Sequence, residues 1–279
     1  MSKYNILWDY VQKQNKPSLT LTFEEIQNIA GRPLDHSFLT CKKELTEYGY
    51  QVGKISMKQQ TVHFDKIRAV IFDMDGVIFD SERAVYQCWQ ELARTHHLAD
   101  LDTAYYKCIG VNSQMCRQVF MAHFGADFPY DDYTAEVSSM YHAKYDHGRL
   151  PLKPGVKELL SYLKKKSFQT AIASSTRTSV VEQQIADAGL RAYFDIIVGG
   201  DMVEKSKPEP DIFLKAADLL HVLPEDAYVI EDSFNGIRAA SSAGMIPVMV
   251  PDMMAPDEEM QQKVRYIVKD LFEVKKLLG

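Results

Sequence analysis

Short apolar runs separated by amphipathic stretches dominate the chain from about residue 67 to its end. Such uninterrupted runs are typical of parallel strands that are buried on both faces. They lie at residues 68–72, 168–173, 194–198, 227–230, 246–250 and 265–268. Between them, apolar residues recur at helical spacing, as in the stripe of Val156, Leu159 and Leu163. This alternation predicts an α/β fold with a doubly wound parallel sheet.

A long helical stretch interrupts the alternation directly after the first strand. Residues 82–149 contain almost only helical patterns and end in a Gly/Pro-rich segment that returns the chain to the sheet. Both ends of the stretch reach the strand ends, where ligands bind in such sheets, so we expect a helical cap that acts as a lid. A rigid helical subdomain without a lid role is the alternative. The predicted core is therefore residues 66–81 and 150–279, with residues 82–149 as the cap.

Residues 1–65 form a separate predicted unit in front of the sheet. Their patterns indicate a helix at 5–13, a strand at 18–22, helices at 23–30 and 38–48, and a hairpin at 50–64. This order resembles a winged helix in topology alone. The unit has eight Lys/Arg and seven Asp/Glu, a net charge of +1, and DNA-binding domains are usually more basic. A protein-contact or dimerisation module is therefore favoured, and DNA binding stays an alternative.

The overall composition narrows the functional classes further. The 279-residue chain carries a net charge of −6, which argues against attraction to nucleic acid or to an anionic membrane. Its four cysteines show no metal-ligand spacing and indicate a reducing compartment. Neither a signal peptide nor a membrane-spanning run is predicted, so we expect a cytoplasmic protein without a membrane partner. The oligomeric state stays open, a homo-oligomer included.

Residues that carry chemistry follow four of the predicted strands. The motifs are, in chain order, Asp73-Met74-Asp75, Ser174-Ser175-Thr176, Ser206-Lys207-Pro208 and Glu231-Asp232-Ser233. Each motif alone is common in turns and helix caps. Their order is specific, because an acid pair, hydroxyls, a lysine and a second acid pair each follow a buried-strand pattern. Since ligands bind at the carboxyl ends of parallel strands, we expect these groups to meet at one site.

This set of groups suits phosphoryl transfer. Asp73 and Asp232 offer oxygen ligands to Mg²⁺, and the backbone carbonyl of Asp75 can add a third. Lys207 can neutralise one phosphate oxygen, while Ser174 and nearby backbone N–H groups hold the others. A carboxylate that faces the metal can attack phosphorus and form an aspartyl-phosphate. The second carboxylate, two residues later, can protonate the leaving group and then deprotonate water.

The strings DMDGVIFDSE, SST, SKPEPDIF and VIEDSFNGIRAASSAG, in this order, resemble the haloacid dehalogenase superfamily. The resemblance covers about residues 67–279 and is strongest to the β-phosphoglucomutase-like phosphatases. It implies an inserted helical cap, Asp73 as the nucleophile and Asp75 as the general acid/base. The implied ligands are Ser174 and Lys207 for the substrate phosphate, and Glu231 and Asp232 with Asp73 and Asp75 for Mg²⁺. Further candidates for the phosphate are Ser175 and Arg177, with a surface position at a helix start as the alternative for Arg177.

Comparison with the branches of this superfamily favours hydrolysis of a phosphate ester. The dehalogenases and phosphonate hydrolases that it resembles do not use an Asp at the position of Asp75. Mutases carry a His where this chain has Val85, and an Arg after Gly-Val where it has Asn112 and Ser113. Cap residues that could compensate, or be ordinary surface charges, are Lys107, Arg117, His123 and Lys144.

We therefore predict a Mg²⁺-dependent phosphatase that acts through an aspartyl-phosphate. Its partner would be a small phosphorylated metabolite such as a sugar phosphate. Two alternatives stay open: a sugar-phosphate mutase of the β-phosphoglucomutase type, and a phosphometabolite-sensing regulator with a DNA- or protein-binding N-terminal unit. Intact acid pairs and Lys207 argue against a regulator without catalysis.

Overall fold

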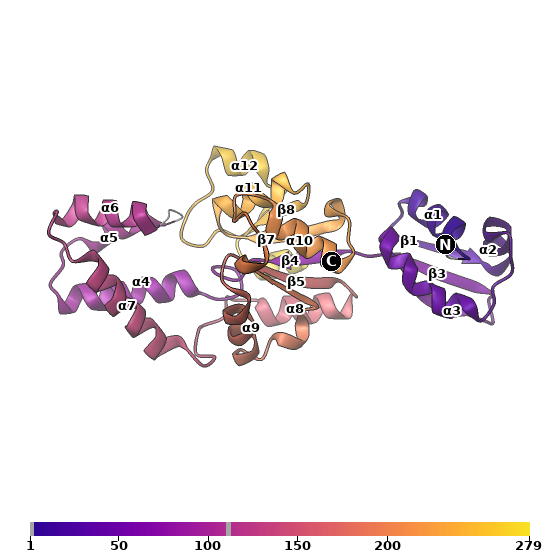
Figure 1. Cartoon of the computed structure of the whole chain (residues 1–279), viewed down its shortest axis with the longest axis horizontal. Helices are drawn as coiled ribbons and strands as arrows, with labels where there is room; N and C mark the ends of the chain where they lie inside the picture. The colour runs from indigo at the N-terminus through magenta and orange to yellow at the C-terminus, as the bar shows by residue number, and fades with distance from the viewer. Residues whose placement is uncertain (1–2, 110–112) are drawn as a thin grey trace.

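The computed structural model describes residues 3–109 and 113–279 and places three units in a row (Figure 1). A small N-terminal unit lies at one end, an α/β unit in the middle, and a helical unit at the other end. Each unit encloses hydrophobic residues of its own. Within the described ranges, no helix is long and apolar enough to cross a membrane.

The middle unit is built on a six-stranded sheet in the order β6-β5-β4-β7-β8-β9. All neighbouring strands in it are parallel. The strands are β4 (Ala69–Phe72), β5 (Gln169–Ser174), β6 (Ile196–Gly199), β7 (Ala227–Glu231), β8 (Ile246–Met249) and β9 (Tyr266–Ile267). They overlap all six predicted apolar runs. The prediction of an α/β fold with a parallel sheet is confirmed.

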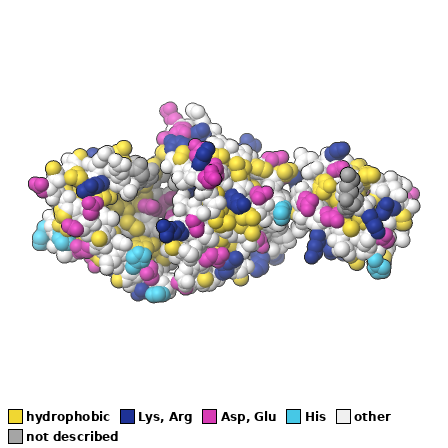
Figure 2. Space-filling model, viewed as in Figure 1, with side chains coloured by type: hydrophobic (Ala, Val, Ile, Leu, Met, Phe, Trp, Pro, Cys, Tyr) yellow, Lys and Arg dark blue, Asp and Glu magenta, His cyan; other side chains and the backbone are white. Residues whose placement is uncertain are grey.

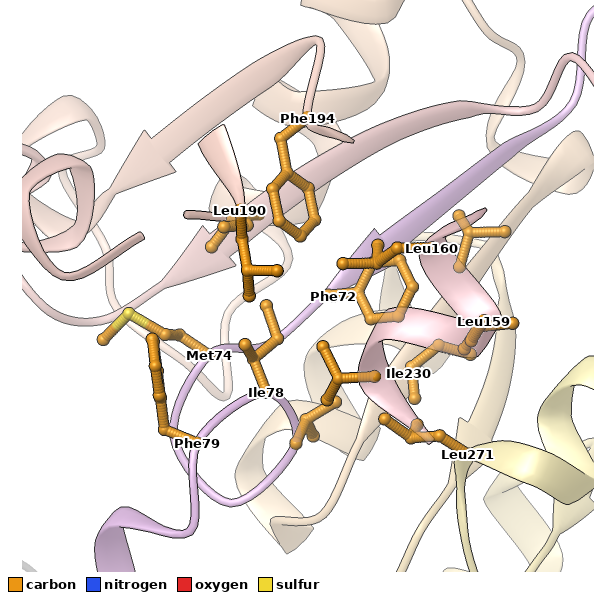
Figure 3. Packing of buried hydrophobic residues seen from close by; sticks show 14 of the residues in the cluster. Phe72, Met74, Ile78, Phe79, Leu159, Leu160, Leu190, Phe194, Ile230 and Leu271 are labelled. Carbon is orange, nitrogen blue, oxygen red and sulfur yellow. The ribbon is translucent and has the colours of Figure 1, made fainter. Parts of the chain in front are cut away.

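Helices cover both faces of this sheet and leave its strands almost fully buried. On one face, Phe72 and Ile230 pack with residues of α8, α9 and α13 (Figure 3). On the other, Ile71 and Val229 pack with residues of α10 and α11. Successive residues of a strand point to opposite faces, so Ile71 and Phe72 anchor β4 in two different clusters. The α-helices of this unit are α8 (Val156–Lys165), α9 (Thr178–Asp187), α10 (Asp211–Leu220), α11 (Phe234–Ser242), α12 (Glu258–Lys263) and α13 (Leu271–Leu277).

The helical unit packs around aromatic side chains, among them Trp89 and Phe120, whose ring centres are 4.8 Å apart. Its α-helices are α4 (Ser81–Thr95), α5 (Leu101–Tyr105), α6 (Ser113–Phe124) and α7 (Tyr130–Tyr145). The two segments that join it to the sheet unit are hydrogen-bonded to each other. Asp80 N–H donates to the carbonyl of Pro151 at 2.9 Å, and Lys153 N–H donates to that of Ile78 at 2.9 Å. The helices expected between residues 82 and 149 are present, and their action as a lid stays a prediction.

The N-terminal unit packs α-helices against an antiparallel sheet of order β1-β3-β2. Its elements are α1 (Asn5–Gln14), β1 (Ser18–Thr22), α2 (Phe23–Ala30), α3 (Ser37–Cys41), the 3₁₀ segment η1 (Lys42–Tyr48), β2 (Tyr50–Ser56) and β3 (Thr61–Lys66). The helix predicted at 38–48 is therefore α-helical only to Cys41. The tighter winding after it places Leu45 in the same buried cluster as Phe38. The winged-helix assignment and the boundary at residue 65 stay predictions.

Removal of the Phe120 ring should destabilise the helical unit specifically. We expect Phe120→Ala to lower the free energy of unfolding of this unit by about 3–5 kcal/mol, because a buried ring is replaced by a cavity. Urea unfolding would be followed by the fluorescence of Trp89, in a background in which the other tryptophan is removed by Trp8→Phe. Gln118→Ala, at an exposed position of the same helix, is the control. Equal stability of the two variants would contradict a separate aromatic core.

Candidate active site

The predicted motifs meet in one cavity of about 190 Å³ at the carboxyl ends of the sheet strands. The helical unit forms part of its wall, and Figure 2 shows the hollow between the two units. The lining residues are Asp73, Asp75, Glu82, Ile109, Ser174, Ser175, Lys207, Glu231, Asp232, Ser233, Phe234, Met253 and Met254. Of the predicted site residues, Arg177 is not among these described lining residues. It lies exposed at the start of α9, in agreement with its alternative role on the surface.

A buried lysine connects three of the strand ends. Lys207 Nζ donates to Asp73 Oδ1 at 2.5 Å, to Glu231 Oε1 at 2.7 Å and to the backbone carbonyl of Ala173 at 3.1 Å. Its side chain is only 6% exposed. Burial lowers the pKa of Lys207, but the carboxylates of Asp73 and Glu231 outweigh this effect and raise the pKa above its ordinary value. Lys207 is therefore a permanent positive charge at the base of the cavity.

Asp73 follows β4 directly and is nearly inaccessible, with 8% of its surface exposed. Its N–H donates to the carbonyl of Ile230 at 2.9 Å, so its backbone continues the pairing of β4 with β7. Burial raises the pKa of Asp73, Lys207 lowers it, and the carboxylates of Glu231 and Asp75 raise it again. Among the described residues, no hydrogen bond uses Asp73 Oδ2. This oxygen is free to contact a metal ion or to attack phosphorus.

Asp75 lies two residues later and faces a different partner. The hydroxyl of Thr176 donates to Asp75 Oδ2 at 3.4 Å. Burial raises the pKa of Asp75 above its ordinary value. A carboxylic acid with a raised pKa keeps its proton at higher pH, as a general acid must. Sequence reasoning did not single out Thr176, although it stands in the Ser174-Ser175-Thr176 motif.

The two acids at the end of β7 have different surroundings. Glu231 is fully buried, and its Oε1 accepts the bond from Lys207. Its Oε2 accepts from the N–H and the hydroxyl of Ser233 at 2.8 and 2.9 Å. A Cβ on Gly236 would lie 1.7 Å from Oε1, so the absence of a side chain there makes room for this carboxylate. Both oxygens of Glu231 therefore accept hydrogen bonds from the protein, and its predicted contact with a metal ion stays a prediction.

Asp232 lies beside the turn that carries the first acid pair. A Cβ on Gly76, whose φ is +77°, would lie 2.1 Å from Asp232 Oδ2. Glycine therefore suits position 76 for two reasons: its φ is positive, and a side chain there would collide with the Asp232 carboxylate. Over the described ranges, the Asp232 carboxylate has no hydrogen bond or ion pair. Burial, Glu231 and Asp73, in that order, raise its pKa well above the ordinary value.

The donor chemistry of this site fits a hard divalent cation such as Mg²⁺. Asp73, Asp75 and Asp232 line the cavity and supply oxygen, which Mg²⁺ prefers. Their buried negative charge is costly without a cation near it. No three His, Cys, Asp or Glu side chains of the described residues are arranged closely enough to form a metal-binding group. The fit therefore rests on donor type and charge.

The charged cap residues considered from the sequence do not line the cavity. Arg117 pairs with Asp131 at 3.0 Å, and Lys144 pairs with Glu91. Lys107 is exposed. His123 Nε2 lies 3.5 Å from the carboxylate of Asp100. Their interpretation as surface charges is the one that the described contacts support.

Other cavity residues carried little or no signal in the sequence. Glu82 belongs to the string DMDGVIFDSE but was not singled out as a site residue. Ile109, Phe234, Met253 and Met254 are apolar residues outside any motif of the acid, hydroxyl and lysine type. Gly110, Val111 and Asn112, which bear on the comparison with mutases, lie outside the described residues.

Comparison with known proteins gives the same family as the motifs. A family model described as haloacid dehalogenase-like hydrolase matches residues 70–250. The phosphorylated carbohydrates phosphatase of Thermotoga maritima is 31% identical over 179 residues, which cover 64% of this chain and 82% of that protein. The β-phosphoglucomutase of Bacillus subtilis is 32% identical over 192 residues, which cover 66% of this chain and 83% of that protein.

A solved structure supports the fold assignment. The HAD family hydrolase from Deinococcus radiodurans R1, with bound phosphate and sodium, superposes with a TM-score of 0.65 at 26% identity. The match covers 76% of this chain and 95% of that one. Since the family model also matches more than half of the sequence, the chain belongs to the haloacid dehalogenase-like hydrolase family, as a phosphoric monoester hydrolase.

Proposed function

We propose that the chain is a Mg²⁺-dependent phosphatase that hydrolyses a small phosphorylated metabolite, of the sugar phosphate kind, through an aspartyl-phosphate. The observation that carries this proposal is the meeting of Asp73, Asp75, Lys207 and Asp232 in one cavity. Mg²⁺ would be held by Asp73, Asp232 and the backbone carbonyl of Asp75. When bound, it would neutralise charge on the phosphoryl oxygens.

Each protein group has a separate task in this reaction. The Asp73 carboxylate attacks phosphorus while Asp75 protonates the departing oxygen, and Asp75 then takes a proton from the water that hydrolyses the intermediate. Lys207 orients Asp73 and offers positive charge to a phosphate oxygen. Ser174 Oγ accepts the N–H of Thr176 at 3.1 Å, which leaves its hydroxyl hydrogen for the substrate phosphate. Ser175, at the cavity wall, is the further phosphate ligand.

Water is favoured over a sugar hydroxyl as the final acceptor of the phosphoryl group. Val85, at the position of the mutase histidine, packs against the hydrophobic cluster of the helical unit. An aliphatic side chain has no group that binds or protonates a sugar phosphate. This departure supports hydrolysis and makes the mutase the second candidate.

We propose roles for the two other units as well. The helical unit, residues 82–149, would act as a lid, since its two connections run side by side and it lines the cavity. The N-terminal unit, residues 1–65, would be a protein-contact module, because its net charge of +1 is low for a DNA-binding domain. The contacts described here do not favour the regulator alternative.

Replacement of the nucleophile should abolish catalysis without unfolding the chain. We expect Asp73→Asn to reduce phosphate release by at least about a thousandfold, because an amide cannot form the aspartyl-phosphate. The measurement is phosphate released from a panel of phosphorylated sugars with Mg²⁺ present. Asp218→Asn, at an exposed position of α10, is the matched control. Full turnover by Asp73→Asn would sink the assignment.

Removal of Lys207 should impair both activity and stability. Lys207→Met leaves two buried carboxyl groups without their cation, so we expect the free energy of unfolding to fall by about 3–5 kcal/mol at neutral pH. Without Lys207, burial and the neighbouring carboxylates raise the pKa of Asp73 in the folded state unopposed, so the folded variant binds a proton more readily than the unfolded chain. Its deficit should therefore shrink as the pH is lowered from about 8 to about 5.

Urea unfolding of Lys207→Met and of the unchanged chain across this pH range measures the effect. Lys215→Met, in α10 outside the cavity lining, is the control for loss of one lysine. A deficit that is constant with pH would show that the two carboxylates do not depend on Lys207.

Asp232 should set the affinity for the metal. We expect chelation to stop phosphate release and Mg²⁺ to restore it, and Asp232→Asn to raise the Mg²⁺ concentration for half-maximal activity by about tenfold or more. Activity would be titrated against Mg²⁺ in both proteins. Asp257→Asn, which caps α12 away from the cavity, serves as control. Unchanged Mg²⁺ dependence in Asp232→Asn would remove it from the ligand set.

A further inference from the structure

The charge of the cavity wall is strongly one-sided. Its described lining contains five carboxyl groups, those of Asp73, Asp75, Glu82, Glu231 and Asp232, and one cation, Lys207. The three residues that follow Ile109 in the sequence are Gly, Val and Asn, none of which has an ionisable side chain. A bound divalent cation and the transferred phosphate would occupy the strand ends. The part of a substrate other than its transferred phosphate would therefore face negatively charged side chains.

Two basic residues close to the cavity in sequence form ion pairs outside it, whereas Arg177 lies exposed at the start of α9. Lys153 binds Asp252 at 2.6 Å and Asp80 at 3.4 Å. Arg83, next to Glu82 in α4, is exposed and pairs with Asp80 at 3.3 Å. Neither basic side chain belongs to the described cavity lining. Within the described cavity lining, a second phosphate or carboxylate of a substrate would therefore find no cation other than Lys207.

Glu82 is the acid on the substrate side of the cavity. It lies in the first turn of α4 and is half-buried. The Tyr105 hydroxyl donates to its backbone carbonyl at 3.4 Å, which ties it to the helical unit. Over the described ranges, the Glu82 carboxylate itself has no hydrogen bond or ion pair. It is thus an acceptor that lines the cavity and has no protein partner.

Apolar side chains complete the same wall. Ile109 comes from the helical unit, Phe234 begins α11, and Met253 and Met254 follow β8. Met253 also packs against the cluster of the helical unit, so this wall spans both units. A surface that combines apolar side chains with one carboxylate acceptor matches the C–H faces and hydroxyl groups of a carbohydrate chain.

On the basis of the proposed phosphatase function, we infer that the cavity selects phosphate monoesters whose remaining part is uncharged and hydroxyl-rich. It discriminates against a second anionic group, and Glu82 determines this selectivity. The Glu82 carboxylate accepts hydrogen bonds from substrate hydroxyls and faces a carboxylate or second phosphate as a like charge. A half-buried acceptor of this kind penalises a like-charged substrate group more than it attracts a hydroxyl group.

Matched pairs of compounds test this inference. Sorbitol 6-phosphate and 6-phosphogluconate differ at the end of the chain, where the second carries a carboxylate. Fructose 6-phosphate and fructose 1,6-bisphosphate differ by a second phosphate. We expect kcat/KM of the full chain with Mg²⁺ to be at least about tenfold higher for the uncharged member of each pair.

The variant Glu82→Gln keeps the shape of the side chain and removes its charge. We expect it to narrow the preference to about threefold or less, chiefly by a lower KM for the anionic member. The control Glu47→Gln changes the net charge equally at an exposed position of the N-terminal unit and should leave the preference unchanged. Loss of preference in both variants would indicate a general charge effect and overturn the role of Glu82.

These measurements distinguish failure of the inference from failure of the proposed phosphatase function. Equal kcat/KM for both members of each pair in the unchanged chain overturns the inference and leaves the phosphatase function intact. Phosphate release from no compound at all contradicts the function. In that case calorimetric titration of the full chain, with Mg²⁺ and the same pairs, decides the inference. Equal binding of both members would overturn it.

Discussion

The ammonium group of Lys207 is the interaction on which the site depends. It is bonded to Asp73 after β4, to Glu231 at the end of β7 and to the carbonyl of Ala173 in β5. Buried ion pairs of this kind add little net stability, because desolvation offsets most of the attraction. Their value here lies in position, since one cation places the ends of three neighbouring strands at distances that packing alone does not determine. Glu231 is in turn held by Ser233 and accommodated by Gly236.

The same network leaves a surplus of negative charge on the open side of the cavity. Lys207 satisfies Asp73 Oδ1 and Glu231, whereas Asp232 has no partner among the described residues. A phosphate dianion would be repelled by such a surface unless a cation binds with it. Binding of metal and of phosphate is therefore expected to be mutually favourable, since each lowers the electrostatic cost of the other.

Sequence patterns predicted the sheet and the acid, hydroxyl and lysine groups because both depend on local signals. Parallel strands buried on two faces produce continuous apolar runs, and residues after them reach one edge of the sheet. Arg177 shows the limit of that reasoning, because position after a strand does not determine where a long side chain points. The different surroundings of Glu231 and Asp232 also became visible only from three-dimensional contacts. Adjacent acids look equivalent until Lys207 and Ser233 are seen to occupy both oxygens of one.

Glu82 and the apolar residues of the cavity wall could not be predicted from the sequence either. The reason differs from the one that applies to Arg177. They belong to separate elements, and only the packing of the helical unit against the loops after β7 and β8 brings them together. Helical periodicity identifies which residues of α4 are buried, but not which neighbouring side chains an exposed edge will face.

The groups proposed for the chemical step lie beside the carboxyl ends of the sheet strands, and two residues proposed to face the rest of the substrate lie on the helical unit. Asp73 is held by the pairing of β4 with β7 and by the buried cation of Lys207, an arrangement that tolerates little change. Glu82 and Ile109 belong to a unit joined by two segments that are hydrogen-bonded to each other. Substitutions on that unit can therefore alter which ester fits without disturbing the reaction. The geometry thus separates what the enzyme does from what it acts on.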